Sequence, residues 1–194
     1  MAELDRMTRL IGDIDLLAAV ETDKFTMADV DLALLTQRVG ELVTVIPDHE
    51  WSIEQTASAV IRGDGDRLLQ AWLQLADNAA KYTPAGSPIE VGSAVNAGGV
   101  QLWVRDHGPG IPPAMRHRIF RRFDRGTGKR SVGGSGLGLA IVDAIAKAHR
   151  GHCAISDTPG GGATFALEIP LGTKAPVPSP VRAGDVLLQR EASA

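Results

Sequence analysis

Cysteine is nearly absent from this sequence. Cys153 is the only one in 194 residues, which excludes an internal disulfide and a cysteine-rich zinc site. An excess of charge is also lacking, since 20 basic and 23 acidic residues leave a net charge of −3, and this balance favours neither nucleic acid nor an anionic membrane as a partner. No apolar run approaches the roughly 20 residues that a membrane-spanning helix needs, and the N-terminus lacks a secretory signal pattern. These absences predict a cytoplasmic protein with no nucleic-acid partner and no direct membrane insertion.

The length of 194 residues fits one domain with additional segments at its ends. Apolar residues recur at steps of three and four near the N-terminus, which predicts an amphipathic helix over residues 1–20. Its apolar face must pack against the rest of the domain or against a second helix. Near the C-terminus, proline-rich and polar sequence predicts a flexible tail over residues 173–194. The domain itself is therefore expected to span residues 21–172.

Helical and strand patterns are mixed in this domain without regular alternation. Asp64 is a candidate cap for the second helix, and Thr83 with Pro84 is its expected stop. Residues 96–99 form a glycine-containing connection that marks a hairpin. The patterns predict an α+β fold, a two-layer sandwich in which a mixed, mainly antiparallel sheet packs on about three helices. The expected helices are 31–45, 66–82 and 137–149, and the expected strands are 51–56, 57–62, 89–95, 100–104, 153–157 and 163–169.

Two glycine-rich strings favour ligand binding over packing. Residues 106–110 (DHGPG) follow a strand, where glycine lets the backbone approach a flat ligand and Asp106 could accept a hydrogen bond from an exocyclic amine. Residues 134–138 (GSGLG) run into a helix, whose free N–H groups bind phosphate oxygens. The second string is neither a Walker loop nor a dinucleotide fingerprint, because the lysine and the closely preceding strand are missing. Each string alone also fits an ordinary turn or flexible loop.

Cationic and amide side chains accompany these strings. Arginine and lysine concentrate among glycines between residues 121 and 130, which suits a lid over a triphosphate, although most charge runs are solvated loops. On the expected helix 66–82, Gln74, Asn78 and Lys81 share one face because of their spacing. Asn78 can be an oxygen ligand for Mg²⁺ and Lys81 can neutralise phosphate. Taken singly, each also fits a polar face toward water.

Together and in order, these motifs resemble the catalytic, ATP-binding domain of sensor histidine kinases. That domain has the Bergerat fold, which it shares with gyrase, a heat-shock chaperone and mismatch-repair proteins. The resemblance covers roughly residues 25–171. The matching motifs are an asparagine box at 75–84 (LADNAAKYTP), a first glycine box at 106–112 (DHGPGIP), a phenylalanine box at 119–126 (IFRRFDRG), a second glycine box at 134–142 (GSGLGLAIV) and a closing strand at 161–165 (GGATF).

The resemblance implies a role for each matching position. Asp106 would bind the adenine amino group, and Asn78 would hold the Mg²⁺ that bridges the phosphates. Asn78, Lys81 and Gln74 would form the catalytic set. The other residues expected to contact ATP are Tyr82, Gly108, Gly110, Ile111, Phe120, Phe123, Arg125, Gly134, Ser135, Gly136, Leu137, Gly138 and Thr164. The implied reaction transfers the γ-phosphoryl group of Mg-ATP to a histidine, from which a response regulator receives it in a two-component pathway.

The sequence departs from the family pattern at two points. Gln74 stands where the family usually has asparagine, and related ATPases have a glutamate there that activates water, so its absence argues against efficient hydrolysis. None of the five histidines has the acidic residue and following Arg-Thr-Pro that mark the family's phosphoacceptor; His49-Glu50 only begins that pattern. The acceptor is therefore expected on a separate protein or a missing domain. Residues 1–20 are expected to be a partial helix that resembles only the end of the second helix of the family's dimerisation hairpin. The chain is expected to be a natural split kinase or part of a longer one, and the starting Met and the C-terminal tail favour the split form.

Two other function classes remain open at this point. One is a serine/threonine kinase of the anti-sigma-factor type, which shares the nucleotide fold but forms an acid-stable phosphoester. The other is a non-catalytic, nucleotide-gated module that binds partners. The phenylalanine box and the Lys81-Tyr82-Thr83-Pro84 string favour the histidine kinase over the serine/threonine kinase. The presence of Asn78, Asp106 and both glycine boxes argues against the non-catalytic module.

Overall fold

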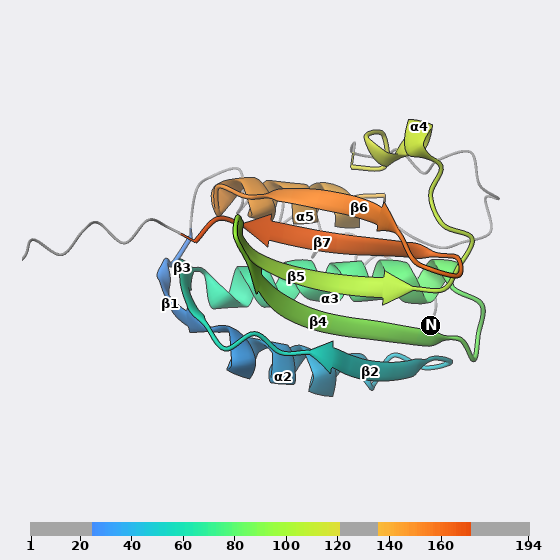
Figure 1. Cartoon of the computed structure of the whole chain (residues 1–194), viewed down its shortest axis with the longest axis horizontal. Helices are drawn as coiled ribbons and strands as arrows, with labels where there is room; N and C mark the ends of the chain where they lie inside the picture. Colours follow the sequence, from blue (N-terminus) through green and yellow to red (C-terminus); the bar gives the residue numbers. More distant parts are fainter. Residues whose placement is uncertain (1–24, 121–135, 172–194) are drawn as a thin grey trace, which may run out of the picture.

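The computed structural model describes residues 25–120 and 136–171, so the expected helix 1–20 and tail 173–194 lie outside it (Figure 1). In chain order, its elements are β1 (Ala28–Asp31), α2 (Leu32–Val43), β2 (Glu50–Gln55), β3 (Val60–Gly63), α3 (Gly65–Tyr82), β4 (Pro88–Asn96), β5 (Gly99–Asp106), α4 (Pro113–Arg116), α5 (Gly138–Ala148), β6 (His152–Asp157) and β7 (Ala163–Ile169).

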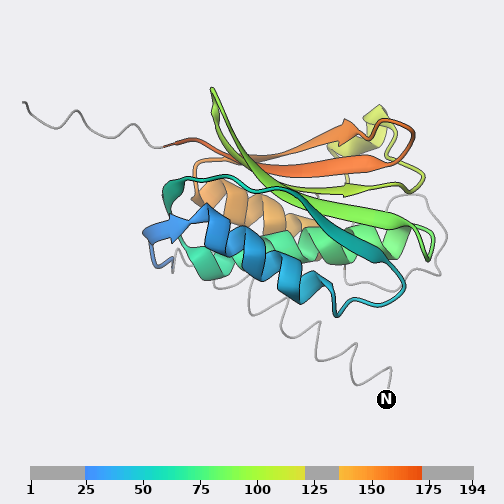
Figure 2. The ribbon, with the colours of Figure 1, turned by 60° about the horizontal axis from the view of Figure 1, so that its bottom comes forward.

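The main sheet has five strands in the spatial order β2-β4-β5-β7-β6. β2 runs parallel to β4, whereas every other neighbouring pair is antiparallel. The long helices α2, α3 and α5 cover one face of this sheet, as the turned view in Figure 2 shows. The predicted α+β sandwich, with a mixed and mainly antiparallel sheet on about three helices, is therefore confirmed for the described part of the chain.

Aspartate caps fix where the first two long helices begin. The Asp31 carboxylate accepts hydrogen bonds from the N–H groups of Ala33 and Leu34, at 2.8 and 3.2 Å, and so caps α2. Asp64 caps α3 by accepting from the N–H of Arg67 at 3.1 Å. Both carboxylates satisfy donors that have no acceptor within the helix. The predicted cap at Asp64 and the predicted stop at Thr83 are confirmed.

The predicted strand 57–62 is wrong in its first half. The N–H of Ala57 donates to the hydroxyl of Ser93 at 2.8 Å, and the carbonyl of Ala59 accepts from the N–H of Leu32 at 3.0 Å. These partners take the backbone groups that a strand would use, so only Val60–Gly63 is extended as β3. β3 pairs with β1, a strand that the sequence analysis did not predict, in a small sheet separate from the main one.

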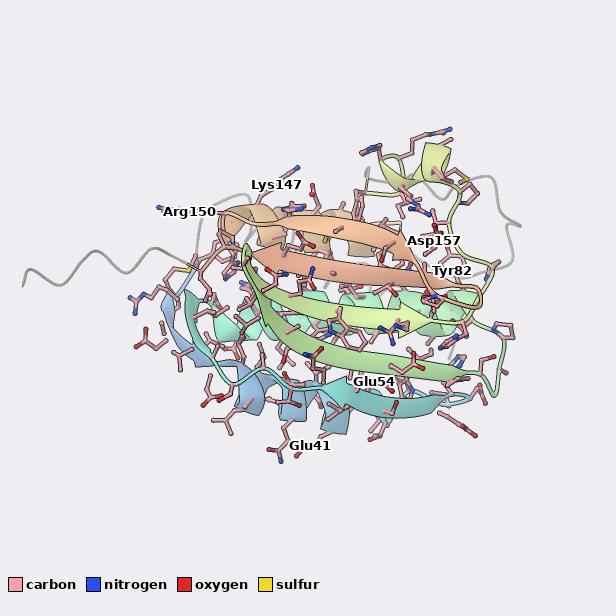
Figure 3. All side chains as sticks on the ribbon, viewed as in Figure 1. Glu41, Glu54, Tyr82, Lys147, Arg150 and Asp157 are labelled. Carbon is pink, nitrogen blue, oxygen red and sulfur yellow. The ribbon has the colours of Figure 1, made fainter. Side chains whose placement is uncertain are left out.

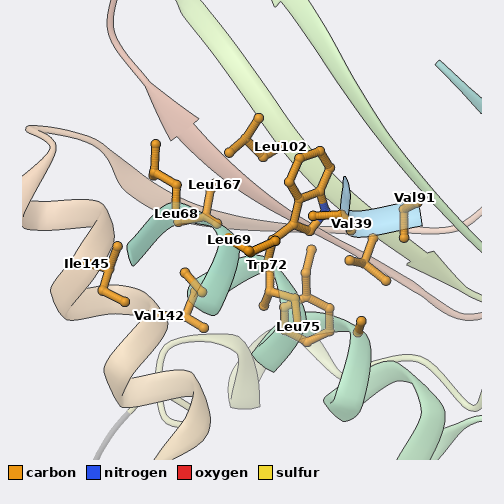
Figure 4. Close-up of a cluster of buried hydrophobic side chains, with 14 of the residues drawn as sticks. Val39, Leu68, Leu69, Trp72, Leu75, Val91, Leu102, Val142, Ile145 and Leu167 are labelled. Carbon is orange, nitrogen blue, oxygen red and sulfur yellow. The ribbon is translucent and has the colours of Figure 1, made fainter. Parts of the chain in front are cut away.

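The core lies between the main sheet and the helices. Trp72 of α3 is fully buried, and its indole N–H donates to the backbone carbonyl of Trp103 on β5 at 3.1 Å. Each buried aliphatic side chain contributes about 1.5–3 kcal/mol, so this core holds α3 and α5 firmly against the sheet. The side chains around Trp72 include Val39, Leu68, Leu69, Leu75, Val91, Leu102, Val142, Ile145 and Leu167 (Figure 4).

The start of α3 and the end of α5 meet at His149. The N–H of Asp64 donates to Nε2 of His149 at 2.9 Å, and Nδ1 of the same ring lies 2.8 Å from the carbonyl oxygen of Ile145. Asp64 also accepts from the N–H of Thr26 at 2.8 Å, which fixes the segment that leads into β1. His149 is 6% exposed, so this junction is part of the interior. None of the described helices is long and apolar enough to cross a lipid bilayer.

Candidate nucleotide site

The polar face of α3 carries the three residues predicted as catalytic. Gln74, Asn78 and Lys81 are half-buried, while the opposite side of the helix supplies Leu68, Trp72 and Leu75 to the core. The side-chain amide of Asn78 makes no hydrogen bond within the described residues. It is therefore available as a ligand for a cation or a polar group.

The ammonium group of Lys81 has a partner that the sequence analysis did not predict. It forms an ion pair with the carboxylate of Asp77, one helical turn earlier on α3. The two side chains are 29% and 45% exposed, so the pair lies at the rim of the site rather than in the interior. Lys81 would have to share its charge between Asp77 and a phosphate.

The beginning of α5 lies directly against this face. A Cβ atom on Gly138 would be only 2.7 Å from Oε1 of Gln74, so a side chain larger than glycine would collide with the amide. The N-cap residue of α5, Leu137, makes no side-chain capping hydrogen bond, and the N–H groups of the first turn have no acceptors within the helix. Gly136, just before the helix, has a φ of 72°, a left-handed conformation that suits glycine. This geometry places the start of α5, the kind of helix end that can bind an anion, beside the amide of Gln74.

Asp106 is the last residue of β5, and the loop that follows it reaches the C-terminal end of α3. This residue is 5% exposed, and its Oδ1 accepts hydrogen bonds from the N–H groups of Gly108 at 2.9 Å and Ala163 at 3.2 Å. No hydrogen bond to Oδ2 occurs within the described residues, which leaves one carboxylate oxygen for a ligand. Burial raises the pKa of Asp106 above its usual value of 3.8, and the two backbone hydrogen bonds partly oppose the shift.

Glycines let three backbone segments meet around Asp106. A Cβ atom on Gly108 would lie 2.8 Å from the carbonyl oxygen of Tyr82, so the loop after β5 touches the end of α3. A Cβ atom on Gly162, in the turn between β6 and β7, would lie 2.0 Å from the carbonyl oxygen of Asp106. Gly110 has a φ of 71°, and a Cβ atom on it would lie 3.1 Å from the carbonyl oxygen of Gly162. These close backbone approaches leave no space for a side chain at the three glycines.

Some of the remaining residues predicted to contact ATP lie within the described residues, and the others lie outside them. Ile111 and Phe120 are half-buried and pack against the core, and the hydroxyl of Thr164 lies 3.1 Å from that of Thr158. Tyr82 is 48% exposed at the end of α3, and Leu137 is buried. The predictions for Phe123, Arg125, Gly134 and Ser135 lie outside the described residues.

The sequence analysis did not predict two residues that contact Asp106 at this site. Gly162 and Ala163 contact Asp106 from 56 or 57 positions further along the chain. The run of three glycines at 160–162 was the available signal, because consecutive glycines mark either a turn or a close backbone approach. Nothing local distinguishes these two meanings.

The five histidines all lie within the described residues, and each has a structural setting. His49 lies between α2 and β2 with Nε2 2.9 Å from the carbonyl oxygen of Ala80, and His107 pairs with Glu90. His149 is buried, as described above. His117 ends the short helix α4, and His152 begins β6 next to Glu168. None of the five projects from the middle of a helix.

The fold and this arrangement of amides, aspartate and glycines are those of an ATP-binding α+β sandwich domain. A family model described as "Histidine kinase-, DNA gyrase B-, and HSP90-like ATPase" matches residues 63–173, and the chain belongs to this family. The expectation drawn from the sequence motifs is thereby confirmed at the level of the family.

The relatives found within this family are sensor histidine kinases. The chain is 37% identical over 186 residues to the probable sensor histidine kinase TcrY of Mycobacterium tuberculosis (strain ATCC 25618 / H37Rv), and the match covers 93% of this chain and 39% of TcrY. The solved structure of the mycobacterial sensor histidine kinase MprB matches with a TM-score of 0.63 and 33% identity, over 75% of this chain and 97% of that one. Full-length ShkA in complex with AMPPNP matches with a TM-score of 0.68 and 31% identity, over 84% of this chain and 35% of that one.

The chain thus spans about two fifths of the length of TcrY.

Proposed function

We propose that this chain binds ATP with Mg²⁺ and transfers the γ-phosphoryl group to a histidine on a separate protein or domain. A response regulator would then receive the phosphoryl group. The observation that carries the proposal is that two features lie against α3. The loop after the buried Asp106 reaches Tyr82, the last residue of the helix, and the start of α5 lies at Gln74, further back along the same helix. A nucleotide has a hydrogen-bonding base at one end and negatively charged phosphates at the other. The buried carboxylate suits the base, and the helix start suits the phosphates.

The adenine end of the nucleotide would lie at the end of β5. Oδ2 of Asp106 can accept a hydrogen bond from the exocyclic amine, while Gly108 and Gly162 let the neighbouring backbone segments pack closely around Asp106. The hydroxyl pair of Thr158 and Thr164 lies beside the same turn and can complete the polar lining.

The phosphate end would lie between α3 and the start of α5. The N–H groups of the first turn of α5 and its helix dipole favour negative charge there. Asn78 is suited to hold Mg²⁺ through its amide oxygen, a hard ligand of the kind this cation prefers. Bound there, the cation would neutralise charge that develops on the phosphates. Gln74 braces Gly138, and so it positions the anion-binding turn rather than activating water.

A histidine acceptor on another polypeptide or domain agrees with the settings of the five histidines of this chain. His149 is 6% exposed and hydrogen-bonded through both ring nitrogens, and His49 and His107 each have a partner at 2.9 Å. The sensor histidine kinases among the relatives favour this reaction over the serine/threonine kinase and over a non-catalytic module. Because ATP is a substrate, we expect the domain to act in the cytoplasm.

The test is phosphoryl transfer in trans. The chain is incubated with γ-labelled ATP and Mg²⁺, with and without a protein that carries a dimerising helix and a His-acidic-x-x-x-Pro motif. We expect acid-labile label on the added protein, because phosphohistidine is hydrolysed in acid and phosphoserine is not. Asn78→Ala is expected to abolish transfer, whereas Gln37→Ala, which removes an exposed amide of α2, serves as the matched control. Acid-stable label, or label on this chain alone, would contradict the proposal.

A further inference from the structure

Arg116, the last residue of α4, links two segments that lie far apart in the sequence. Its Nε donates a hydrogen bond to the carbonyl oxygen of Ile111 at 3.0 Å. A terminal nitrogen of the same guanidinium donates to Oδ1 of Asp157 at 2.5 Å. The Arg116 side chain is 21% exposed and that of Asp157 is 74% exposed, so the arginine is the anchored member of the pair. We call this arrangement of Arg116, Ile111 and Asp157 the arginine clasp.

The arginine clasp joins the two backbone segments that form the proposed adenine pocket. Ile111 follows the glycine-rich loop that begins at Asp106, and Asp157 is the last residue of β6, directly before the turn that contains Gly162. These segments already touch where Ala163 donates to Asp106 and where Gly110 lies against Gly162. Figure 1 shows α4 beside the end of β6, and Figure 3 shows Asp157 toward the same end of the sheet as Tyr82.

We propose that Arg116 is a positioning residue for the nucleotide, one that holds the two walls of the adenine pocket together before ATP binds. The proposal rests on the nucleotide-binding function proposed above and goes beyond it, because Arg116 itself need not touch the nucleotide. The guanidinium is suited to this task since its donors are fixed in one plane and can serve a carbonyl and a carboxylate together. A pocket that is already assembled loses less freedom when its ligand binds.

The clasp should act on affinity and not on the chemical step. The two hydrogen bonds of Arg116 reach the loop after β5 and the end of β6. Both segments lie on the side of the site where we place the adenine base. Loss of the clasp should therefore weaken the binding of Mg-ATP and of Mg-ADP by the same factor. The rate of phosphoryl transfer at saturating ATP should stay unchanged. A general loss of folding would instead lower both the rate and the melting temperature.

The experiment is titration calorimetry of the full chain with Mg-ATP and with Mg-ADP. Charge-assisted hydrogen bonds of this kind correspond to about tenfold in a dissociation constant, so Arg116→Met is expected to weaken both ligands by roughly fivefold to tenfold. Asp157→Asn is expected to raise both dissociation constants by about twofold to threefold, because an exposed ion pair contributes less to stability. The double variant should bind no more weakly than Arg116→Met alone, since both substitutions break one unit. Arg62→Met is the matched control, because Arg62 pairs with Asp29 on the separate small sheet.

Each failure has its own signature. If the wild-type chain does not bind Mg-ATP, the proposed function fails, and the clasp with it. If the wild type binds and Arg116→Met and Asp157→Asn bind equally well, the clasp proposal alone is overturned. Losses that add in the double variant, or a slower transfer at saturating ATP, would also overturn it. Should Arg116→Met fail to fold, Asp157→Asn decides the question, because its side chain is 74% exposed and its replacement leaves the interior unchanged.

Discussion

Asp106→Asn is the substitution that separates binding of the base from folding of the pocket. Two N–H groups, of Gly108 and Ala163, point at Oδ1 of Asp106. An asparagine must turn its amide oxygen toward these donors, because the reverse orientation would bring its NH₂ group against two N–H groups. The NH₂ group then takes the place of Oδ2 and faces the exocyclic amine of adenine, donor against donor.

The magnitude follows from the bond that is lost. A hydrogen bond to a charged group is worth about 1.5–3 kcal/mol, which corresponds to about a 10- to 150-fold weaker dissociation constant for ATP. Folding should be unaffected or slightly favoured, since both backbone donors keep their acceptor and the buried charge disappears. Asp106→Ala, by contrast, leaves two N–H groups without a partner and should cost about 2 kcal/mol or more of folding free energy.

The assay compares ATP and GTP binding with the melting temperature. Guanine carries a carbonyl oxygen where adenine carries its amine, so the NH₂ group of the Asp106→Asn variant can donate to it. The variant should therefore lose preference for ATP over GTP while its melting temperature stays within a few degrees of wild type. An unchanged preference for ATP at an unchanged melting temperature would refute the assignment of Asp106 to the base.

Four further predictions concern Asp106, Gly162 and Ser93. Burial raises the pKa of Asp106, so ATP affinity should fall on acidification through that raised pKa, at a higher pH than for an ordinary aspartate, and Asp106→Asn should not show this step in pH-dependent titrations. In the nucleotide-free protein the same shift gives a contribution to stability that is present at low pH and lost as pH rises through the raised pKa, measurable by denaturation at several pH values. Gly162→Ala should abolish nucleotide binding in calorimetry, since its Cβ would lie 2.0 Å from the carbonyl oxygen of Asp106 at a φ of 112°. Ser93→Ala should lower the free energy of unfolding in urea by about 1–3 kcal/mol, because the fully buried hydroxyl accepts from the N–H of Ala57.

The parts of the fold that could be predicted are those governed by neighbours in sequence. The helix α3 begins after Asp64 and ends before Thr83 because a cap and a residue before proline act within one turn. The hairpin of β4 and β5 follows from alternation on both sides of a glycine-containing connection. The buried side of α5, with Ile141, Val142 and Ile145, follows from its periodicity in the same way.

The contacts that the sequence did not reveal join distant positions. Ala163 bonds to Asp106 across 57 positions, and Arg116 bonds to Asp157 across 41. No spacing rule connects such pairs, because their approach depends on how β5, β6 and β7 are ordered in the sheet. The pairing of Lys81 with Asp77 is local and could have been predicted from its i, i+4 spacing.

The central claim is that one nucleotide lies along α3, with its base at Asp106 and its phosphates at the start of α5. A crystal structure of the chain with Mg²⁺ and a non-hydrolysable ATP analogue tests it. We predict the adenine amine at Oδ2 of Asp106, the phosphates at the N–H groups of the first turn of α5, and the metal at the side-chain oxygen of Asn78. A nucleotide bound elsewhere, or with its phosphates at Asp106 and its base at α5, would contradict the account.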